Sequence, residues 1–377
     1  MEEVGPKLRI LHVLTLNGKN GEYGGPVRVA REMCTELNKR GFSTQIFSGS
    51  LKNSEPITTP GLKESYIFVK PLLKQFPISS LWNLKLGKAL YEVIKDSDIV
   101  HIHFARDLIS YFTAIISIMQ HKEFVTQTHG MVISDGRIST RIVDMIFTKP
   151  LLKKSKMNFV LTPQELEELK KIKIFGPNRI LRNGISRSVQ AEKRSSTIRR
   201  VVFCSRLDRR KGVDKFIDLA EYFKNSKIKF EIYGTDFGEL TFIENEIKNR
   251  KLFEVIQYRG ALEPQQVQEM LKSVDLLVLP SKNEPYPMIV LESLAVGTPA
   301  MVMPSCGIAE TLKKFDARLV AKSEDSKSLI LAFSEILSKD KIEREIVQDF
   351  CKMEFSIEAI IDELVKVYSE GKFKGIR

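Results

Sequence analysis

The chain has 377 residues, two to three times the usual length of a single domain, and this length predicts two domains of similar size. With 43% apolar and 28% charged residues, the composition is that of a globular protein and excludes disordered, collagen-like and coiled-coil classes. The formal charge of +12 is uneven, because residues 1–190 carry +11 and residues 191–377 carry +1. A basic half of this kind favours nucleic acid, an anionic membrane face or phosphorylated substrates as partners.

The cysteines and the N-terminus indicate a cytoplasmic protein. The four cysteines lie too far apart for a metal motif or a dense disulfide framework, which favours a reducing compartment and apolar, buried thiols. They are Cys34, Cys204, Cys306 and Cys351. The opening Met-Glu-Glu lacks a basic region, so we expect no export signal. The longest apolar run, 108–119, has 12 residues and is too short to span a bilayer.

Short β-rich runs alternate with helical patterns along both halves, which predicts parallel sheets covered by helices. In the first half we expect strands at 8–16, 43–49, 99–103, 124–129 and 157–162, and helices at 26–40, 81–95, 107–120 and 137–152. In the second half we expect strands at 199–207, 228–234, 253–260, 274–281 and 298–303, with helices beginning at Gly212 and Met288.

The alternation stops near Asn183-Gly184, and a polar stretch follows. We therefore predict a first domain at 1–186, a linker at 187–197 and a second domain at 198–354, with a last helix inside 355–377. The predicted fold class is α/β, with two facing, doubly wound, Rossmann-like domains. Ligands bind at the carboxyl ends of the strands in such sheets, so the cleft between the domains is the expected site.

The segment 283–299 is the most informative. Glu284 should lie in the loop after a buried strand, and Glu292 should lie one turn into a helix that begins near Met288 and stops at Gly297. A helix N-terminus there would suit a phosphate, and a carboxylate one turn in can accept from two ribose hydroxyls. The alternative is that both glutamates are ordinary solvated charges.

The segment 205–212 places two cations at the end of the first strand of the second half. Arg206 should end that strand and Lys211 should stand at the start of the following helix, where both can neutralise a departing diphosphate. Arg209 and Arg210 are expected to face solvent. The alternative is a solvated basic loop.

A glycine loop and one histidine complete the candidates in the first half. Gly24 and Gly25, in a loop between the first strand and first helix, would let backbone N–H groups approach an anion. The loop is not GxGxxG, which argues against a nicotinamide enzyme. His129 ends a strand before a glycine, so its ring should project into the cleft. We expect structural roles for the other four histidines, His12, His101, His103 and His121.

No set of His, Asp, Glu or Cys residues has a convincing metal-ligand spacing. Asp96-Ser97-Asp98 has the DxD form that can hold a divalent cation, but it precedes a strand, and we interpret it as a helix-to-strand turn.

These residues together resemble the retaining nucleotide-sugar glycosyltransferases of family 4, which have the GT-B fold. The resemblance rests on GGP, DIVHIH, THG, NGI, SRLDRRKG and the E-x7-E pattern ending in GTP, and it covers nearly the whole chain. It implies that Glu292 binds the donor ribose, that Glu284 approaches the donor sugar and phosphate, and that Arg206 and Lys211 hold the diphosphate.

The resemblance further implies that His129 contacts the transferred sugar, making it catalytic together with Arg206, Lys211 and Glu284. The implied donor-binding set is Gly24, Gly25, Arg206, Lys211, Gly234, Arg259, Gly260, Ala261, Glu284, Pro287, Met288, Ile289 and Glu292. Gly24 and Gly25 would lie under the phosphates, and residues 259–261 would contact the base through their backbone. The last helix would cross back to the first domain.

The implied reaction is retaining hexosyl transfer from a UDP- or GDP-sugar to a hydroxyl of a glycan or a polyprenyl-diphosphate-linked acceptor, with no cofactor or metal. Bacterial O-antigen or capsule synthesis is the implied setting, and the protein would be cytoplasmic or peripheral at the inner membrane face. One departure concerns the donor sugar: Pro287-Met288 stands where the family often has Gly-Leu, and proline offers no N–H to a sugar hydroxyl.

The basic first half has two candidate membrane-facing regions, the segment 70–88 and a set of basic residues. The set is Arg137, Arg141, Lys149, Lys153, Lys154 and Lys156. A solvated basic surface is the alternative. Three other functions stay open: a sugar-nucleotide epimerase or phosphorylase on the same frame, a basic nucleic-acid-binding protein, although no basic helix or aromatic RNA motif is present, and a catalytically dead scaffold.

Overall fold

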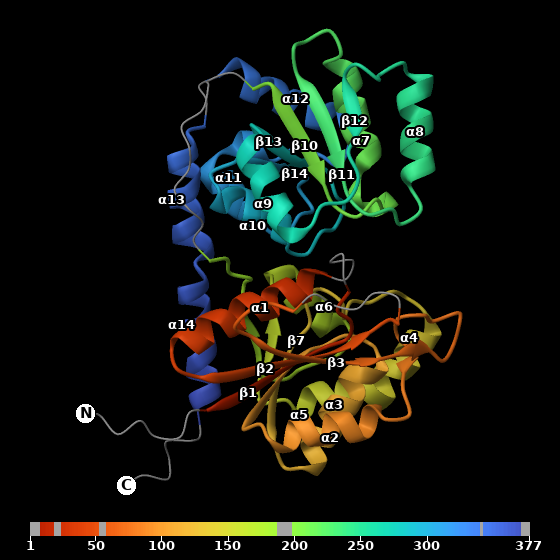
Figure 1. Ribbon diagram of the computed structural model, residues 1–377, viewed down its shortest axis with the longest axis vertical. Coiled ribbons are helices and arrows are strands. Elements are labelled where there is room, and N and C mark those ends of the chain that lie inside the picture. The colour runs from red at the N-terminus through yellow and green to blue at the C-terminus, as the bar shows by residue number, and fades with distance from the viewer. Residues whose placement is uncertain (1–7, 19–23, 53–57, 187–197, 340–341, 371–377) are drawn as a thin grey trace, which may run out of the picture. The chain divides into compact units, whose positions relative to one another are not determined.

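The structure, a computed structural model, describes residues 8–18, 24–52, 58–186, 198–339 and 342–370 (Figure 1). The chain divides into two compact units. Unit 1 comprises residues 1–184 and 357–377, and unit 2 comprises residues 185–356. The predicted linker, 187–197, lies outside the described residues. Both units are α/β with parallel sheets, which confirms the predicted fold class.

The main sheet of unit 1 has the strand order β3-β2-β1-β6-β7-β8-β9, and its neighbours are parallel. Its strands are β1 (Arg9–Leu14), β2 (Ser43–Ser50), β3 (Lys63–Phe68), β6 (Ile99–His103), β7 (Glu123–Gln127), β8 (Asn158–Val160) and β9 (Asn178–Ile180). A separate antiparallel pair joins β4 (Lys70–Pro71) to β5 (Leu81–Trp82). The strand order reverses between β1 and β6.

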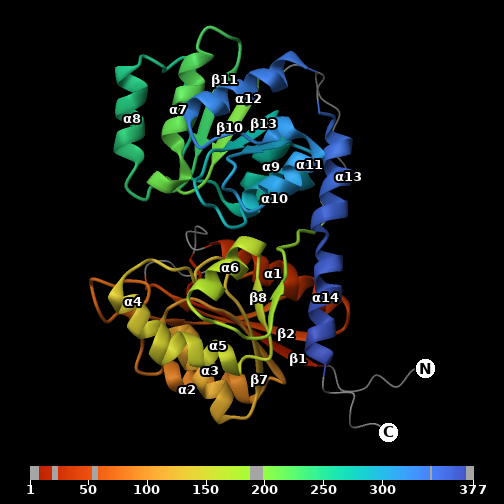
Figure 2. The same ribbon diagram turned by 180° about the vertical axis from the view of Figure 1, so that it is seen from behind.

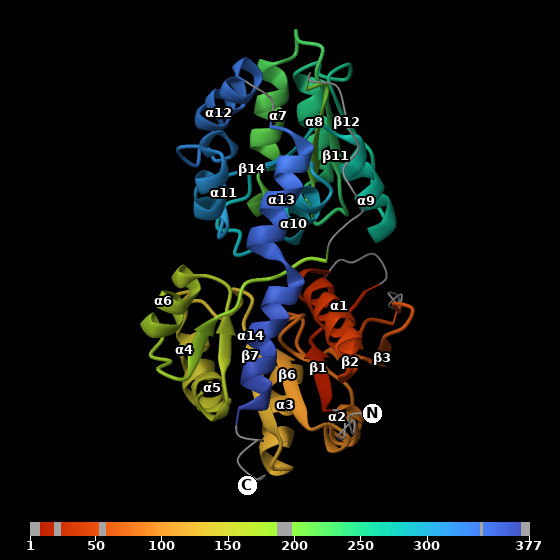
Figure 3. The same cartoon turned by 90° about the vertical axis from the view of Figure 1, so that its left-hand side faces the viewer.

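Helices cover both faces of this sheet. They are α1 (Gly24–Lys39), α2 (Leu86–Lys95), α3 (Leu108–Met119), α4 (Ile138–Val143), a π-helical turn (Asp144–Thr148), α5 (Lys149–Lys154), α6 (Pro163–Lys171) and α14 (Ile357–Ser369). Successive strand side chains point to opposite faces, so Val100 and Ile102 join the core under α2 and α3. On the other face α14 lies beside α1 (Figure 3), where Arg40 bonds Asp362 at 2.5 Å.

Unit 2 has a parallel sheet in the order β12-β11-β10-β13-β14, which reverses between β10 and β13. Its strands are β10 (Arg200–Cys204), β11 (Lys229–Tyr233), β12 (Ile256–Tyr258), β13 (Leu276–Leu279) and β14 (Ala300–Val302). Its helices are α7 (Val213–Tyr222), α8 (Leu240–Asn249), α9 (Pro264–Ser273), α10 (Met288–Ala295), α11 (Ala309–Phe315), α12 (Ser326–Ser338) and α13 (Arg344–Phe355), with 3-10 turns at Arg209–Lys211 and Ala317–Leu319.

Aromatic side chains join part of this unit's core. The ring of Phe230 on β11 lies against Phe216 of α7 and Phe333 of α12. Figure 2 shows α7 and α8 on one side of the sheet and α9, α10 and α13 on the other. The four cysteines are free and buried, as the sequence predicts.

Several element predictions need correction. The helix predicted at 137–152 is interrupted by the π-helical turn, whose extra residue turns both Asp144 and Thr148 into the protein. The helix predicted inside 355–377 is α14, and a separate helix, α13, ends just before it at Phe355. The strands β3 and β9 and the helix α6 were not predicted. Within the described parts of the chain, no helix has both the length and the apolar character needed to cross a bilayer.

Candidate functional site

The loops that follow β10 and β13 lie side by side at the strand-order reversal of unit 2. Lys282 N–H donates to the Arg210 carbonyl at 3.0 Å, and the Ser281 hydroxyl donates to the Lys211 carbonyl at 3.3 Å. Gly212 makes this approach possible: it has φ +74°, and a Cβ there would stand 2.1 Å from the Pro280 carbonyl oxygen. Any side chain at this position would force the two loops apart.

Lys211 and Glu284 form an ion pair between these two loops. The Lys211 Nζ lies 2.5 Å from Glu284 Oε2, and the two side chains retain only 13% and 19% of their exposed surface. The Glu284 carbonyl also accepts a bond from Gly307 N–H at 2.8 Å, which ties its loop to the segment after β14. The structure therefore brings together two residues that the sequence predicts separately, and it pairs their charges.

Arg206 lies beyond β10 and not at its end, because that strand stops at Cys204. Its guanidinium carbon stands 5.1 Å from the centre of the Phe237 ring, a cation–π contact. Leu207 N–H donates to the Thr235 carbonyl at 2.9 Å and Phe237 N–H donates to the Leu207 carbonyl at 3.1 Å, so the loops after β10 and β11 are joined. Phe237 thus supports a predicted site residue, a role that sequence spacing does not reveal.

Glu292 lies on α10, which begins at Met288 with Pro287 at its N-cap, as predicted. No side chain caps this N-terminus. Burial raises the pKa of the Cys204 thiol to about 12, and the negative charge of Glu292 adds to that shift. Glu292, which is partly buried, therefore lies near Cys204, the last residue of β10.

The glycines Gly234 and Gly260 lie next to each other at the ends of β11 and β12. Gly234 N–H donates to the Gly260 carbonyl at 3.0 Å, and the Tyr258 hydroxyl donates to the Gly234 carbonyl at 2.9 Å. A Cβ at Gly234 would lie 1.7 Å from the Ser205 carbonyl oxygen, so only glycine fits. The flanking Arg259 and Ala261 are exposed.

In unit 1, the backbone of His129 is held in an unusual conformation. Its φ is +49°, and the following Gly130 has φ +73°. Buried Glu165 fixes this turn: one carboxylate oxygen accepts from Gly130 N–H and the Thr128 hydroxyl, both at 2.5 Å, and the other accepts from Leu161 N–H at 2.6 Å. A non-glycine residue with positive φ costs about 1–3 kcal/mol, so the surroundings must impose it.

Two predictions about unit 1 change, and one residue of the site was not predicted. The His129 ring is buried and stacked on His103, at 5.0 Å between centroids, and is not an isolated projecting ring. Gly24 and Gly25 belong to the first turn of α1 and not to a loop before it. Glu165 was not predicted as a site residue, although Thr162-x-x-Glu165 is a helix-start pattern. Thr162 does cap α6, because its side chain accepts a hydrogen bond from Glu165 N–H.

The DxD segment has the structural role that the sequence indicates. Asp96 caps α2, and Asp98 accepts hydrogen bonds from the Arg9 backbone N–H at 2.8 Å and from its guanidinium. Among the described residues, no group of three or more His, Cys, Asp or Glu side chains is arranged to hold a metal ion.

We compared the sequence with models of known protein families, and two of them match. The sequence model "Glycosyltransferase Family 4" matches residues 23–189, and "Glycosyl transferases group 1" matches residues 186–350. Between them they cover most of the chain. The chain belongs to the family 4 glycosyltransferases of the GT-B fold.

Characterised relatives align over part of their length. The alpha-galactosylglucosyldiacylglycerol synthase of Streptococcus pneumoniae is 31% identical over 143 residues, 35% of this chain and 36% of the relative. A Campylobacter jejuni enzyme, N,N'-diacetylbacillosaminyl-diphospho-undecaprenol alpha-1,3-N-acetylgalactosaminyltransferase, is 26% identical over 160 residues, 42% of this chain and 41% of the relative. The chain thus matches well under half the length of each relative.

Solved structures share the fold over nearly the whole chain. The Anabaena HepE protein, solved with UDP and glucose, has a TM-score of 0.76 at 14% identity and covers 96% of this chain and 100% of its own. The sucrose-phosphate synthase of Thermosynechococcus elongatus has a TM-score of 0.73 at 16% identity and covers 97% of this chain and 99% of its own.

Proposed function

We propose that this protein transfers a hexosyl group, with retention of anomeric configuration, from a UDP- or GDP-sugar to a hydroxyl of a glycan or lipid-diphosphate-linked acceptor. The observation that carries the proposal is the Lys211–Glu284 ion pair at the strand-order reversal of unit 2. Reversal points of parallel sheets are where nucleotides bind. Arg206 on a neighbouring loop and Glu292 on α10 add a second cation and a second carboxylate at the same sheet edge.

The chemistry follows from these charges. The bond between the anomeric carbon and the β-phosphate oxygen breaks, and its electron pair stays on the diphosphate. The acceptor oxygen bonds to the same face of that carbon, and its proton passes to the departing phosphate, so no separate base is required. Arg206 and Lys211 stabilise the charge that develops on the diphosphate, and Glu292 binds the ribose hydroxyls.

The relatives favour one donor class and one acceptor class within this proposal. HepE was solved with UDP and glucose, which favours a UDP-sugar for this chain. The Campylobacter relative acts, by its name, on a diphospho-undecaprenol acceptor. The chain's basic first half, at +11 over residues 1–190, suits an anionic lipid-linked acceptor of this kind, as used in O-antigen or capsule assembly.

Two substitutions test the proposal with a panel of nucleotide sugars. Arg206→Ala and Glu292→Ala should each lower transfer by roughly 10²–10³-fold, measured as glycoside formed together with free nucleoside diphosphate. Arg210→Ala and Glu310→Ala are matched controls, because both side chains are largely exposed at 77% and 80%. Wild-type rates in both test variants would refute the assignment, and nucleotide release without a glycoside would favour an epimerase or phosphorylase.

The location we propose for unit 1 is an anionic membrane surface, contacted through the amphipathic segment 138–154. Four large apolar side chains on it are exposed, at spacings of three or four residues that place them on one side of the helix. They are Ile138 (74%), Ile142 (49%), Met145 (64%) and Ile146 (53%). The flanking exposed basic residues are Arg137, Arg141, Lys153 and Lys154. Apolar and basic side chains together suit the headgroup region of an anionic bilayer.

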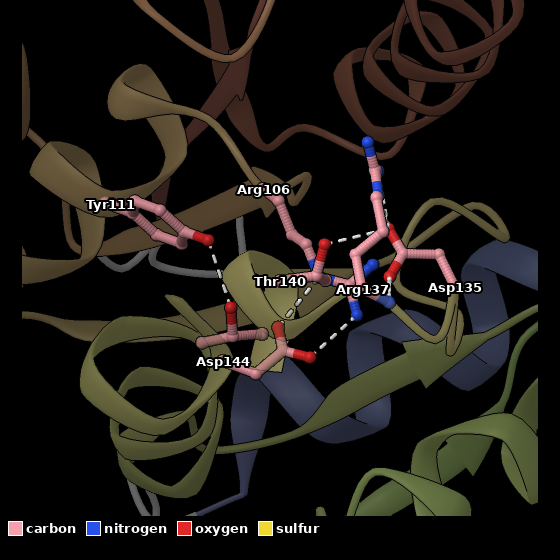
Figure 4. Close-up of polar contacts among 7 residues, drawn as sticks. Arg106, Tyr111, Asp135, Arg137, Thr140 and Asp144 are labelled. Atoms are coloured by element: carbon pink, nitrogen blue, oxygen red, sulfur yellow. Dashed lines mark hydrogen bonds and ion pairs between the residues drawn. The ribbon is translucent and has the colours of Figure 1, made fainter. Parts of the chain in front are cut away.

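The opposite side of this segment is fixed to unit 1 by polar contacts (Figure 4). Arg106 forms a two-bond ion pair with buried Asp144, at 2.7 and 2.9 Å, and the Tyr111 and Thr148 hydroxyls lie 3.0 Å apart. The π-helical turn carries both inward residues, which leaves the apolar residues between them outside. Lys156 is excluded from the predicted surface, because it bonds Glu123 at 2.9 Å and is mostly buried.

Vesicle flotation tests this surface. The protein should float with phosphatidylglycerol vesicles at low salt and not with phosphatidylcholine vesicles, since each basic residue near an anionic surface contributes about 1 kcal/mol. Ile142→Ser with Ile146→Ser should weaken flotation, whereas Met353→Ser, on an exposed methionine of unit 2, should not. No flotation of the wild-type protein at low salt would refute the membrane location.

A further inference from the structure

Four buried histidines lie on one face of the unit 1 sheet. His12 on β1 is level with His101 on β6, and His103 is two residues further along the same strand. His129 follows β7 two residues after Gln127, which pairs with His103. Because side chains alternate along strands, all four rings are on the face covered by α1 and α14. The pairing of three parallel strands therefore assembles the group.

Three of the rings form a continuous hydrogen-bonded chain. His12 Nδ1 lies 3.1 Å from His103 Nε2, and His103 Nδ1 lies 2.7 Å from His129 Nε2. The rings of His103 and His129 are almost parallel, at 10°. His101 stacks on both His12 and His103, and its own Nδ1 lies 2.7 Å from the hydroxyl of Tyr368 on α14. His101 thus packs against the side of the hydrogen-bonded histidines and holds them in place.

The two ends of this row of hydrogen-bonded histidines differ. At the inner end, His12 Nε2 is buried and has no hydrogen-bond partner among the residues that the structure describes. At the outer end, His129 keeps 9% of its surface exposed, and Nδ1 is its ring nitrogen not engaged by His103. A neutral imidazole carries one N–H and one bare nitrogen, so two proton arrangements satisfy both internal bonds.

Only one arrangement avoids burying an unpaired N–H. If His129 Nε2–H donates inwards, His103 Nε2–H donates to His12, and the proton on His12 Nε2 is a buried donor without a partner. If the chain runs outwards, His12 Nδ1–H and His103 Nδ1–H donate, and only a bare nitrogen is left at His12 Nε2. Orphaned buried N–H groups are rarer than under-satisfied acceptors, so the outward direction is favoured.

We propose that His12 and His103 are positioning residues that fix His129 as the neutral tautomer with its proton on Nδ1, so that His129 acts as a hydrogen-bond donor and not as a base. The effect on transfer rests on the proposed function: the Nδ1–H would donate to an oxygen of the bound sugar or acceptor. The tautomer itself does not depend on that function.

Burial keeps all four histidine rings uncharged. It lowers the pKa of His12 and His129 to about 3, and it lowers the pKa of His101 and His103 well below the ordinary value, with repulsion among the rings adding to the effect for these two. The other groups that face the cluster are the Tyr368 hydroxyl on α14, with Cys34 of α1 near it, and the Gln127 amide on β7. Burial raises the pKa of Tyr368 and Cys34, so both are uncharged at neutral pH.

Long-range 1H–15N spectra of protein labelled with 15N-histidine test the proposal directly. At pH 7.5 we expect His129 to show a neutral ring with a protonated Nδ1 and a bare Nε2, and to keep this pattern at pH 5.5. The His129→Gln variant identifies the His129 signals by their loss.

Two variants of His103 separate positioning from packing. His103→Leu removes the donor to His129, so His129 should lose the single Nδ1–H pattern and transfer should fall about tenfold or more. His103→Asn can donate from an amide nitrogen near the former Nδ1, and it should restore the pattern and most of the activity. A KM close to the wild-type value in both variants would place the loss in kcat.

A wild-type His129 with its proton on Nε2, or charged at pH 7.5, would overturn the proposal, and this measurement needs no variant to fold. An unchanged His129 spectrum in His103→Leu would also overturn it. If the spectra match expectation but no nucleotide sugar is turned over, the proposed function fails while the tautomer assignment holds.

Discussion

The two units have the same strand order around their reversal points but different chemistry there. In unit 2 the ends of β10 and β13 carry the Lys211–Glu284 pair, in loops that are only partly buried. In unit 1 the ends of β1 and β6 carry a hydrogen bond of 2.7 Å from the Thr15 hydroxyl to buried Asp107, whose carboxylate also caps α3. The shared topology sets where a ligand can bind, and the loop residues decide what is bound.

The distribution of histidines sharpens the contrast. All five histidines of the chain lie in unit 1, and four of them are buried and neutral. Unit 2 instead carries at its reversal point a charged pair, Lys211 and Glu284, that is only partly buried. The units should therefore respond differently to acid, to charge removal and to changes of shape.

Acid should unfold unit 1 before unit 2. A buried histidine with a lowered pKa favours folding at neutral pH. For His12 and His129 this contribution is lost as pH falls from about 6.5 towards 3, at about 1.4 kcal/mol per pH unit for each. The pKa values of His101 and His103 are also lowered, so these residues act in the same direction. Asp107 opposes this: burial raises its pKa to about 6, so its protonation favours the fold as pH falls, but it is one group against four.

Unit 2 should keep its stability to a lower pH in the same acid titration. Although burial opposes it, hydrogen bonds from Arg210 lower the pKa of Asp208 below 3.8, so the stability it contributes is lost only below that pH. Trp82, the sole tryptophan, reports on unit 1 by fluorescence, and hydrogen exchange of β10 and β13 peptides reports on unit 2. Earlier loss of protection in β10 and β13 would contradict the prediction.

Removing the cation of the ion pair should affect activity more than folding. Lys211→Ala should lower kcat by roughly 10²–10³-fold, about 2.7–4 kcal/mol of transition-state stabilisation, because the departing diphosphate loses a preorganised charge. Single-turnover transfer with saturating donor is the measurement. The exposed neighbour Lys282 provides the control variant Lys282→Ala, which should retain wild-type rates, and equal losses in the two variants would point to general loop damage.

Adding a methyl group at Gly212 should destabilise unit 2 by more than about 3 kcal/mol. The positive φ alone costs about 1–3 kcal/mol for a non-glycine residue, and the new Cβ would also displace the Pro280 carbonyl. Gly238→Ala is the matched control, because it has φ +103° with nothing within 4 Å of the added Cβ. Urea unfolding that gave equal losses in both variants would show that the two loops can separate without cost.

The smallest effect should come from the turn that holds His129. Glu165→Gln replaces one carboxylate oxygen by an NH₂ group, which then opposes a backbone N–H, and this should cost about 1–3 kcal/mol. Exposed Glu167 provides the control Glu167→Gln, which should be neutral in urea unfolding followed by Trp82 fluorescence. A neutral Glu165→Gln would mean that the positive φ of His129 does not depend on that carboxylate.

Much of the fold was predictable because it rests on local patterns. Period-two and continuous apolar runs located the long strands within one or two residues at most ends, and Pro287 marked the start of α10. Short edge strands such as β3 and β9 were missed because their side chains alternate weakly between buried and exposed. The π-helical turn was missed because it depends on Asp144 reaching Arg106, which is distant in the sequence.

The candidate site also has a part that local sequence patterns predicted and a part that they did not. Arg206, Lys211, Glu284 and Glu292 were found from motifs, because each follows or begins a recognisable element. Their partners were not: Phe237 under Arg206, and Glu165 under the His129 turn, come from segments whose contacts are set by strand pairing. For the same reason His12, His101 and His103 read as separate structural histidines in the sequence.

The sequence by itself determined the α/β class, the two-unit organisation and the residues that carry charge at the end of each strand. These properties depend on patterns within a few tens of residues, where helix and strand periodicity act. Only the tertiary structure decided that Lys211 meets Glu284 and that three histidines from three strands form one hydrogen-bonded chain. Such contacts depend on which strands pair and in what register, and that is settled by packing across the whole unit.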